Sequence, residues 1–245
     1  GAAPPPPEKV ERLLALDPLE LEVGYALIPL VDSSQGGDLL ERIRLLRRQF
    51  ATDLGFVVPP IRIRDNLQLK PSQYALKIRG LEVATGEILL GHYLAMNPGT
   101  AQGPLDGIET REPTFGLPAH WIPARLKEQA QLQGYTVVDP SAVIATHLTE
   151  VIRTHARELL ARQDVQALLD HLKQTQPAVV DGLIPGLLPL GAVHKVLQNL
   201  LGEGVSIRDL STVLETLADH APPTRDPNLL TEYARQALAK NICRP

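Results

Sequence analysis

Two histidine–glutamate pairs are the residues whose types and spacing could do chemistry. His147 lies three residues before Glu150, and His155 and Glu158 repeat that spacing eight residues later. Residues three apart share one face of a helix, where imidazole and carboxylate groups could chelate a metal ion. A di-metal bundle also needs carboxylates from facing helices, and the sequence has no matching second motif. We therefore favour a solvated helix face with local His–Glu pairing, and keep a metal-dependent enzyme as the lesser alternative.

The other short motifs that usually mark an active site do not occur. Gly36 and Gly37 lack the Lys-Ser/Thr pair of a phosphate-binding loop and the spacing of a dinucleotide fingerprint. No serine has the context of a nucleophile elbow. The single cysteine, Cys243, allows neither an intramolecular disulfide nor a cysteine-based metal site. We predict a protein that is not an enzyme and needs no cofactor.

The composition argues against nucleic acid as a partner. The chain has 245 residues, of which 44% are hydrophobic and 21% charged, and its net charge is -4. A nucleic-acid binder needs a cationic surface, and a cluster of four arginines between residues 42 and 48 is better explained as a solvated helix face. No apolar run approaches the roughly 20 residues of a membrane helix, so we expect the chain as given to be soluble.

The segment REPTFGLPAHWI, residues 111–122, is a candidate binding segment. It is bounded by proline and glycine, and it brings Phe115, Leu117 and the only tryptophan, Trp121, within seven residues. One interpretation is that Phe115 fills the core of its own domain, as most aromatic side chains do. The other is an apolar patch that faces a partner. The pattern alone does not decide between them.

The elements that must position these residues fall into two halves. Alternating apolar and polar residues predict strands, and a helix capped by Asp38 is expected to run to Gly55. The predicted strands are 19–25, 57–58, 61–64, 74–78, 88–96 after a hairpin turn at Thr85-Gly86, a short one near 108, and 135–138. A helix is expected over 123–133, and Asp139-Pro140 begins another. Everything after it has the leucine and valine stripes of helices, so the first half is mixed α/β and the second all α.

The N-terminal segment is expected to be a linker. Residues 4–7 are a proline run that favours an extended conformation. Residues 8–16 then have Val10, Leu13 and Leu14 on one stripe of a short amphipathic helix. A helix this short is marginal by itself, so it should dock on its own domain or on a neighbour.

Several longer motifs carry a resemblance to a known family. They are EVGYALIPLVD, GDLLERIRLLRRQ, VPPIRIRDNLQLKPSQY, TREPTFGLPAHWI, GYTVVDPSAVIATHL and SIRDL. In the same order, from about Val10 to Ile242, the chain resembles the cytoplasmic region of the FHIPEP family of flagellar type III export-gate proteins. The resemblance implies a place at the cytoplasmic face of the bacterial inner membrane. It also implies an upstream membrane domain that this chain lacks and a last domain before which it stops.

The resemblance further implies the fold class, an α+β multidomain chain. A linker over residues 1–17 would precede a thioredoxin-like mixed α/β domain formed by 18–90 and 140–159. A small ferredoxin-like domain, 91–139, would be inserted in it, and an all-α helical domain, 160–245, would follow.

The resemblance also implies a docking site between the first two domains for export chaperones that carry filament-type substrates. Its lining would be Met96, Pro98, Glu112, Phe115, Leu117 and Thr146. Phe115 and Leu117 would be the apolar anchor, and Met96 an adaptable contact. Glu112 and Thr146 would supply polar specificity at the rim.

Three kinds of partner follow from the resemblance: chaperone–substrate complexes, components of the export ATPase complex, and neighbouring copies of the chain. The copies would form a ring, nonameric in the family, with Val10, Leu13 and Leu14 of the linker touching the next copy. The alternative is a purely structural ring component without a docking role.

Overall fold

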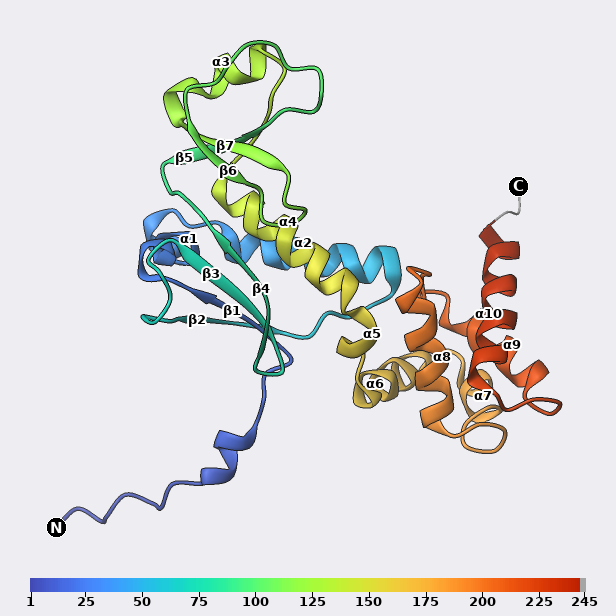
Figure 1. Cartoon of the computed structure of the whole chain (residues 1–245). Helices are drawn as coiled ribbons and strands as arrows, with labels where there is room; N and C mark the ends of the chain where they lie inside the picture. The colour runs from blue at the N-terminus through green and yellow to red at the C-terminus, as the bar shows by residue number, and fades with distance from the viewer. Residues whose placement is uncertain (243–245) are drawn as a thin grey trace.

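Two four-stranded sheets and a group of helices make up the chain (Figure 1). The computed structural model describes residues 1–242, so Cys243, on which the disulfide and cysteine-site predictions rest, lies outside the described residues. Within residues 1–242 no helix is both long and apolar enough to span a membrane. The mixed α/β character of the first half and the helical second half are as predicted.

The first sheet has the strand order β2-β1-β3-β4. Its strands are β1 (Leu19–Val23), β2 (Ile61–Asp65), β3 (Gln73–Ile78) and β4 (Leu81–Glu87). β1 is parallel to β2 and antiparallel to β3. Alternation along β1 sends Leu19 and Leu21 into the core, while Glu22 on the opposite face pairs with Lys77 of β3 at 2.7 Å.

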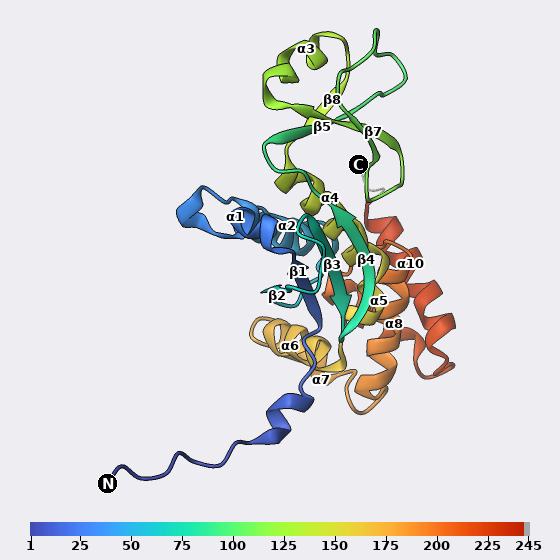
Figure 2. The same ribbon diagram turned by 60° about the vertical axis from the view of Figure 1, so that its left-hand side comes forward.

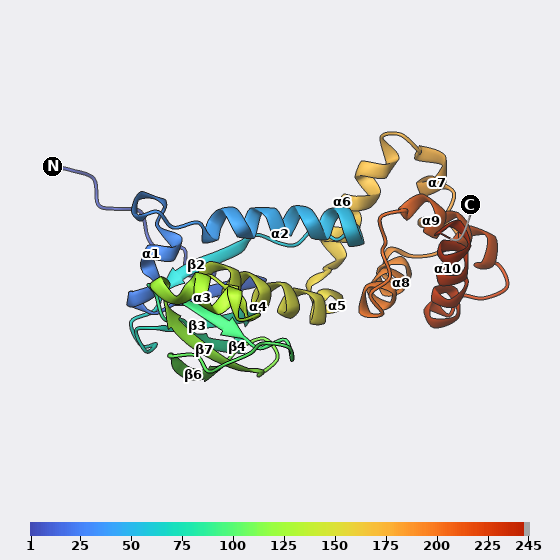
Figure 3. The ribbon, with the colours of Figure 1, turned by 90° about the horizontal axis from the view of Figure 1, so that it is seen from above.

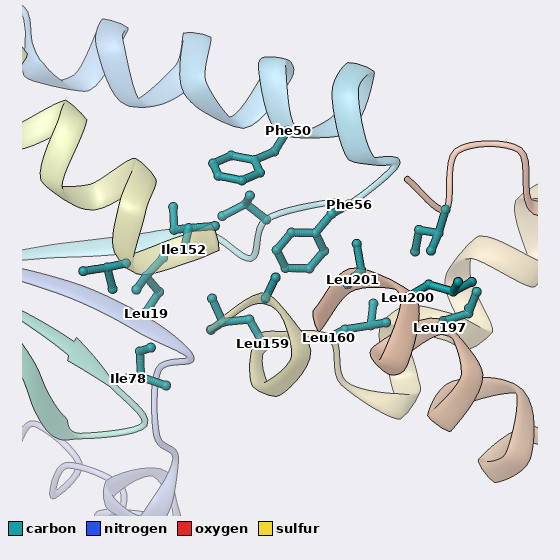
Figure 4. Packing of buried hydrophobic residues seen from close by; sticks show 14 of the residues in the cluster. Leu19, Phe50, Phe56, Ile78, Ile152, Leu159, Leu160, Leu197, Leu200 and Leu201 are labelled. Carbon is teal, nitrogen blue, oxygen red and sulfur yellow. The ribbon is translucent and has the colours of Figure 1, made fainter. Parts of the chain in front are cut away.

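Two long helices lie side by side against this sheet (Figure 3). They are α2 (Leu39–Leu54) and α4 (Pro140–Thr154), and proline at the first position of α4 costs no hydrogen bond there. Figure 4 shows Phe50 of α2 and Ile152 of α4 pointing toward Leu19 of β1, and all three are buried. The short elements η2 (Tyr25–Leu27), α1 (Ile28–Val31) and η3 (Ser33–Gln35) connect β1 to α2.

The second sheet stands at the N-terminal end of α4 (Figure 2). Its order is β6-β7-β5-β8, formed by β5 (His92–Met96), β6 (Ile108–Arg111), β7 (Pro118–Pro123) and β8 (Thr136–Val138). The elements η4 (Ala124–Leu126) and α3 (Lys127–Leu132) cross from β7 to β8. A small core of its own contains Ala95, Ile122 and Ala130.

The remaining helices continue from the C-terminal end of α4. They are α5 (Ala156–Leu159), α6 (Arg162–Lys173), α7 (Pro177–Asp181), α8 (Leu190–Gly202), α9 (Leu210–His220) and α10 (Pro227–Ile242). Leu159 and Leu160 join the core of the first sheet to the leucines of α8, so one hydrophobic core runs through both parts (Figure 4).

Several predicted elements differ in the structure. The hairpin turn predicted at Thr85-Gly86 is wrong, because those residues lie inside β4 and the chain turns at Arg79 and Gly80, which have φ of 49° and 81°. Gly86 is needed in β4 because a Cβ there would come within 2.4 Å of the Tyr74 hydroxyl. Residues 57–58 form no strand, the strand predicted over 88–96 is confined to β5, and β7 was not predicted.

The N-terminal helix is a single 3-10 turn, η1 (Val10–Leu14), on an arm that leads away from the rest of the molecule (Figure 1). None of its residues is buried, and Leu13 and Leu14 are 72% and 78% exposed. Within this chain the segment therefore does not dock on its own domain.

Candidate functional site

The turn between β6 and β7, residues 112–117, is closed on itself by hydrogen bonds. The backbone N–H of Glu112 donates to the carbonyl of Leu117 at 2.8 Å, and the N–H of Gly116 donates to the carbonyl of Glu112 at 3.0 Å. Gly116 has φ of 71°, a left-handed conformation that glycine adopts at little cost. Arg111 donates to the carbonyl of Gly116 at 2.8 Å. The turn is thus a defined structure rather than a loose loop.

The carboxylate of Glu112 holds this turn from inside. It accepts hydrogen bonds from the backbone N–H groups of Thr114 at 3.0 Å and of Phe115, with a longer contact of 3.5 Å from that of Leu117. The Glu112 residue is only 6% exposed. The prediction that Glu112 supplies polar specificity at the rim therefore does not match its position, because its oxygens are engaged with the backbone of the turn.

The two aromatic residues Phe115 and Trp121 differ in burial. Phe115 is 64% exposed and Leu117 52%, whereas Trp121 of β7 is 5% exposed and belongs to the core. The sequence left open whether Phe115 fills the core of its own domain. In the structure Trp121 does so and Phe115 does not. Two large apolar side chains held in water on one turn make a candidate contact surface.

Phe115 faces α4 across an open hollow of about 420 Å³, which we call the Phe115 hollow. Its other lining residues come from α2 and α4: Arg42, Ala142, Ala145, Thr146, Thr149, Glu150 and Arg153. The structure thus brings Phe115 and Thr146 together from segments 31 residues apart in sequence (146 minus 115). The lining that α4 contributes combines the short side chains of alanine and threonine with the charged Glu150 and Arg153.

The other predicted site residues do not line the Phe115 hollow. Met96, at the end of β5, is half-buried and packs against the main core. Pro98 is exposed in the loop that follows β5, and Leu117 is exposed on the same turn as Phe115. The predicted role of Met96 as an adaptable contact stays a prediction.

A second, more apolar hollow adjoins the first between α2 and α4. Its volume is about 460 Å³, and it is lined by Leu45, Leu46, Gln49, Phe50, Asp53, Leu54, Thr149 and Arg153. Thr149 and Arg153 line both hollows, so the two form one continuous depression along α4.

A buried hydrogen bond supports the wall of the Phe115 hollow that α4 forms. The hydroxyl of Tyr74, on β3, lies 2.6 Å from Nδ1 of His147, which directly follows Thr146. Burial raises the pKa of Tyr74 well above its usual value, and the negative charge of Glu112 adds to this effect. Burial lowers the pKa of His147, an effect that Glu112 partly opposes. The pair is therefore neutral near pH 7.

The predicted solvated face for the two His–Glu pairs is wrong at His147, which is 6% exposed. Nδ1 of His155 lies 2.9 Å from the carbonyl of Val151, and Glu150 pairs with Arg153 at 3.1 Å. Among the described residues, no three His, Cys, Asp or Glu side chains converge as metal ligands. The metal alternative finds no site in residues 1–242.

Arg42 has a structural role that the sequence did not reveal. Its guanidinium pairs with Asp38 at 2.9 Å and with Asp139, just before α4, at 3.0 Å. Asp38 also accepts a hydrogen bond from Ser141 of α4. This network ties the start of α2 to the start of α4, beside the Phe115 hollow. Arg47 donates to the carbonyl of Val58 at 2.9 Å, so only Arg44 and Arg48 fit the predicted solvated face.

The FHIPEP family model matches residues 2–245, nearly the whole chain. The chain belongs to the FHIPEP family. A "Flagellar biosynthesis protein FlhA" of Bacillus subtilis is 56% identical to it over 236 residues, which cover 96% of the chain and 35% of that protein. The chain therefore spans about a third of the length of this relative.

Two solved structures have the same fold. The Chlamydia pneumoniae CdsV protein superposes with a TM-score of 0.81 at 26% identity, over 93% of this chain and 68% of that one. The nonameric EPEC SctV-C, at 23% identity, gives a TM-score of 0.70 over 93% of this chain and 67% of that one. The arrangement of two sheets followed by helices is thus common to this FHIPEP chain and to both structures.

Proposed function

We propose that this FHIPEP chain is a docking platform of the flagellar type III export gate, and that the Phe115 hollow receives export chaperones with their bound substrates. The observation that carries the proposal is the exposure of Phe115 on a closed turn, opposite the short side chains of α4. Family membership and the flagellar relative support the export role. The proposed function is binding and includes no catalytic step.

The hollow suits a protein partner for a physical reason. A few apolar anchors that become fully desolvated usually carry most of the binding energy of an interface. Phe115 and Leu117 are already exposed, so a partner can cover them without first unfolding part of this chain. Binding then loses little to reorganisation.

Titration of a purified flagellar chaperone–filament-protein complex against the chain tests the proposal. Phe115→Ala should weaken binding by about 2 kcal/mol, roughly thirtyfold in Kd, the usual loss at an aromatic hot spot. The control is Leu132→Ala, which removes an exposed leucine of α3 that lines neither hollow; Leu132 is 89% exposed, against 64% for Phe115. Equal affinity for the chain and Phe115→Ala would rule out Phe115 as the anchor.

A second candidate function is assembly into a ring, and η1 favours it. Val10, Leu13 and Leu14 are all more than half exposed, although apolar stripes are normally covered. A neighbouring copy is the proposed acceptor, and a nonameric structure with the same fold is in keeping with this.

Deletion of residues 1–16 tests the ring proposal. Removal of the stripe should abolish self-association in sedimentation velocity experiments at concentrations where the full chain associates. Self-association of the shortened chain at the same concentrations would contradict the role of η1, while chaperone titration of both forms would report on docking separately.

The finer features that the family implies remain part of the same proposal. They are a thioredoxin-like domain over 18–90 and 140–159, a ferredoxin-like insert over 91–139, a helical domain from 160, and a linker over 1–17. The proposed setting is the cytoplasmic face of the bacterial inner membrane. Components of the export ATPase complex are proposed as further partners there.

A further inference from the structure

Glu112 is the one acidic side chain buried inside the turn that carries Phe115. Carboxylates are rarely buried unless hydrogen bonds compensate for the lost hydration. Here the compensation comes from the backbone N–H groups of Thr114 and Phe115, with Leu117 at the longer distance of 3.5 Å. All the donors belong to the turn itself. The charge of Glu112 is thus used within the chain and is not directed at solvent.

The exposed fractions of the turn residues indicate which of them a partner can contact. Glu112 is 6% exposed and offers a partner almost no surface, while Phe115 and Leu117 are 64% and 52% exposed. Without the carboxylate, the N–H groups of residues 114, 115 and 117 would lose their common acceptor. The turn would then keep the two backbone hydrogen bonds between residue 112 and residues 116 and 117.

We propose that Glu112 is a positioning residue of the docking site. Its buried carboxylate holds the 112–117 turn in one conformation, so that Phe115 and Leu117 are ordered before the partner binds. The proposal rests on the docking function proposed above. Ordering a loop at the moment of binding reduces affinity, so a turn that is ordered beforehand binds more tightly through the same contacts. Glu112 therefore acts on affinity through Phe115 and Leu117, not through its own contact with the partner.

Two substitutions at Glu112 separate this role from direct ionic contact. Glu112→Gln removes the charge but keeps one side-chain oxygen as an acceptor, whereas Glu112→Ala removes both. With the chaperone–filament-protein complex as probe, Glu112→Ala should weaken binding roughly tenfold and Glu112→Gln by clearly less. The matched control is Glu109→Gln, an exposed glutamate on β6 in the same sheet, which should bind like the unmodified chain.

Salt dependence and a double-mutant cycle complete the test. The effect of Glu112→Ala should be the same at low and high ionic strength, and it should shrink to about threefold or less in a chain that already carries Phe115→Ala. Equal losses in Glu112→Gln and Glu112→Ala that disappear at high salt would overturn the proposal, because they would indicate a charge in contact with the partner.

Amide hydrogen exchange in the free chain gives a readout that does not depend on any partner. The N–H groups of Thr114 and Phe115, the two closest donors to the carboxylate, should exchange at least about tenfold faster in Glu112→Ala than in the unmodified chain, with the strands of the first sheet unchanged. Unchanged exchange at these two amides would overturn the positioning role. If the unmodified chain fails to bind the complex while exchange changes as expected, the docking function fails and the positioning of the turn stands.

Discussion

At the scale of single residues, the candidate site depends on polar groups whose partners are far away in sequence. His147 reaches Tyr74 across 73 positions, and Arg42 reaches Asp139 across 97. Both contacts fasten α4, one to the first sheet and one to α2. Buried hydrogen bonds of this kind stabilise a structure chiefly because removal of one partner leaves the other unsatisfied. The position of Thr146 at the Phe115 hollow follows from them.

The buried His147 should make the free energy of unfolding depend on pH. Its pKa is lowered in the folded chain, so below about pH 6.5, the ordinary histidine value, the unfolded chain binds more protons than the folded one. The contribution of neutral His147 is fully present above that pH and is lost as the pH falls toward its lowered folded pKa. Urea unfolding between about pH 7 and about pH 5 should therefore show a smaller loss of stability in His147→Gln than in the unmodified chain.

The control for that measurement is His171→Gln, which removes an exposed histidine of α6. It should leave the pH dependence unchanged. An identical pH dependence in His147→Gln and the unmodified chain would contradict the link between the burial of His147 and acid sensitivity.

The sequence alone could locate the turn at the Phe115 hollow, but it could not predict the burial and the hydrogen-bond partners of the residues around the hollow. The motif around Phe115 and its family resemblance identified the segment, and Phe115 and Thr146 do meet at one hollow. Glu112 was assigned to the rim and His147 to a solvated face, since nothing local reveals a buried acceptor or a partner on another strand. The partner of His147 lies 73 positions away, which local patterns of charge and spacing cannot encode. The donors to Glu112 are local, but only the folded turn shows that its carboxylate is buried against them.

At the scale of elements, helices were easier to predict than strands. The apolar spacing of α2 and the Asp139-Pro140 start of α4 give strong local signals, and both helices occur as expected. Even so, Asp38 binds Arg42 and Ser141 instead of capping its own helix. β7 was missed because Pro118 and Pro123 bound it, although proline is compatible with the ends of a strand.

At the scale of the whole molecule, the first sheet and the helical half share one core, whereas the second sheet also has a small core of its own. The Phe115 hollow lies where the second sheet meets α2 and α4, with Phe115 contributed by one part and Thr146 by the other. A partner seated there would contact both parts at once. We propose that this junction is the docking site.

Hydrogen exchange of the chain with and without the chaperone–filament-protein complex shows whether a partner covers this junction. We expect the bound complex to slow exchange in residues 112–117 and in residues 142–150 of α4, the two walls of the Phe115 hollow, because a partner that covers them excludes water and restrains local opening. Binding accompanied by protection only elsewhere, such as in residues 10–16 or in the helices after α5, with both walls unchanged, would show that the partner docks away from the Phe115 hollow.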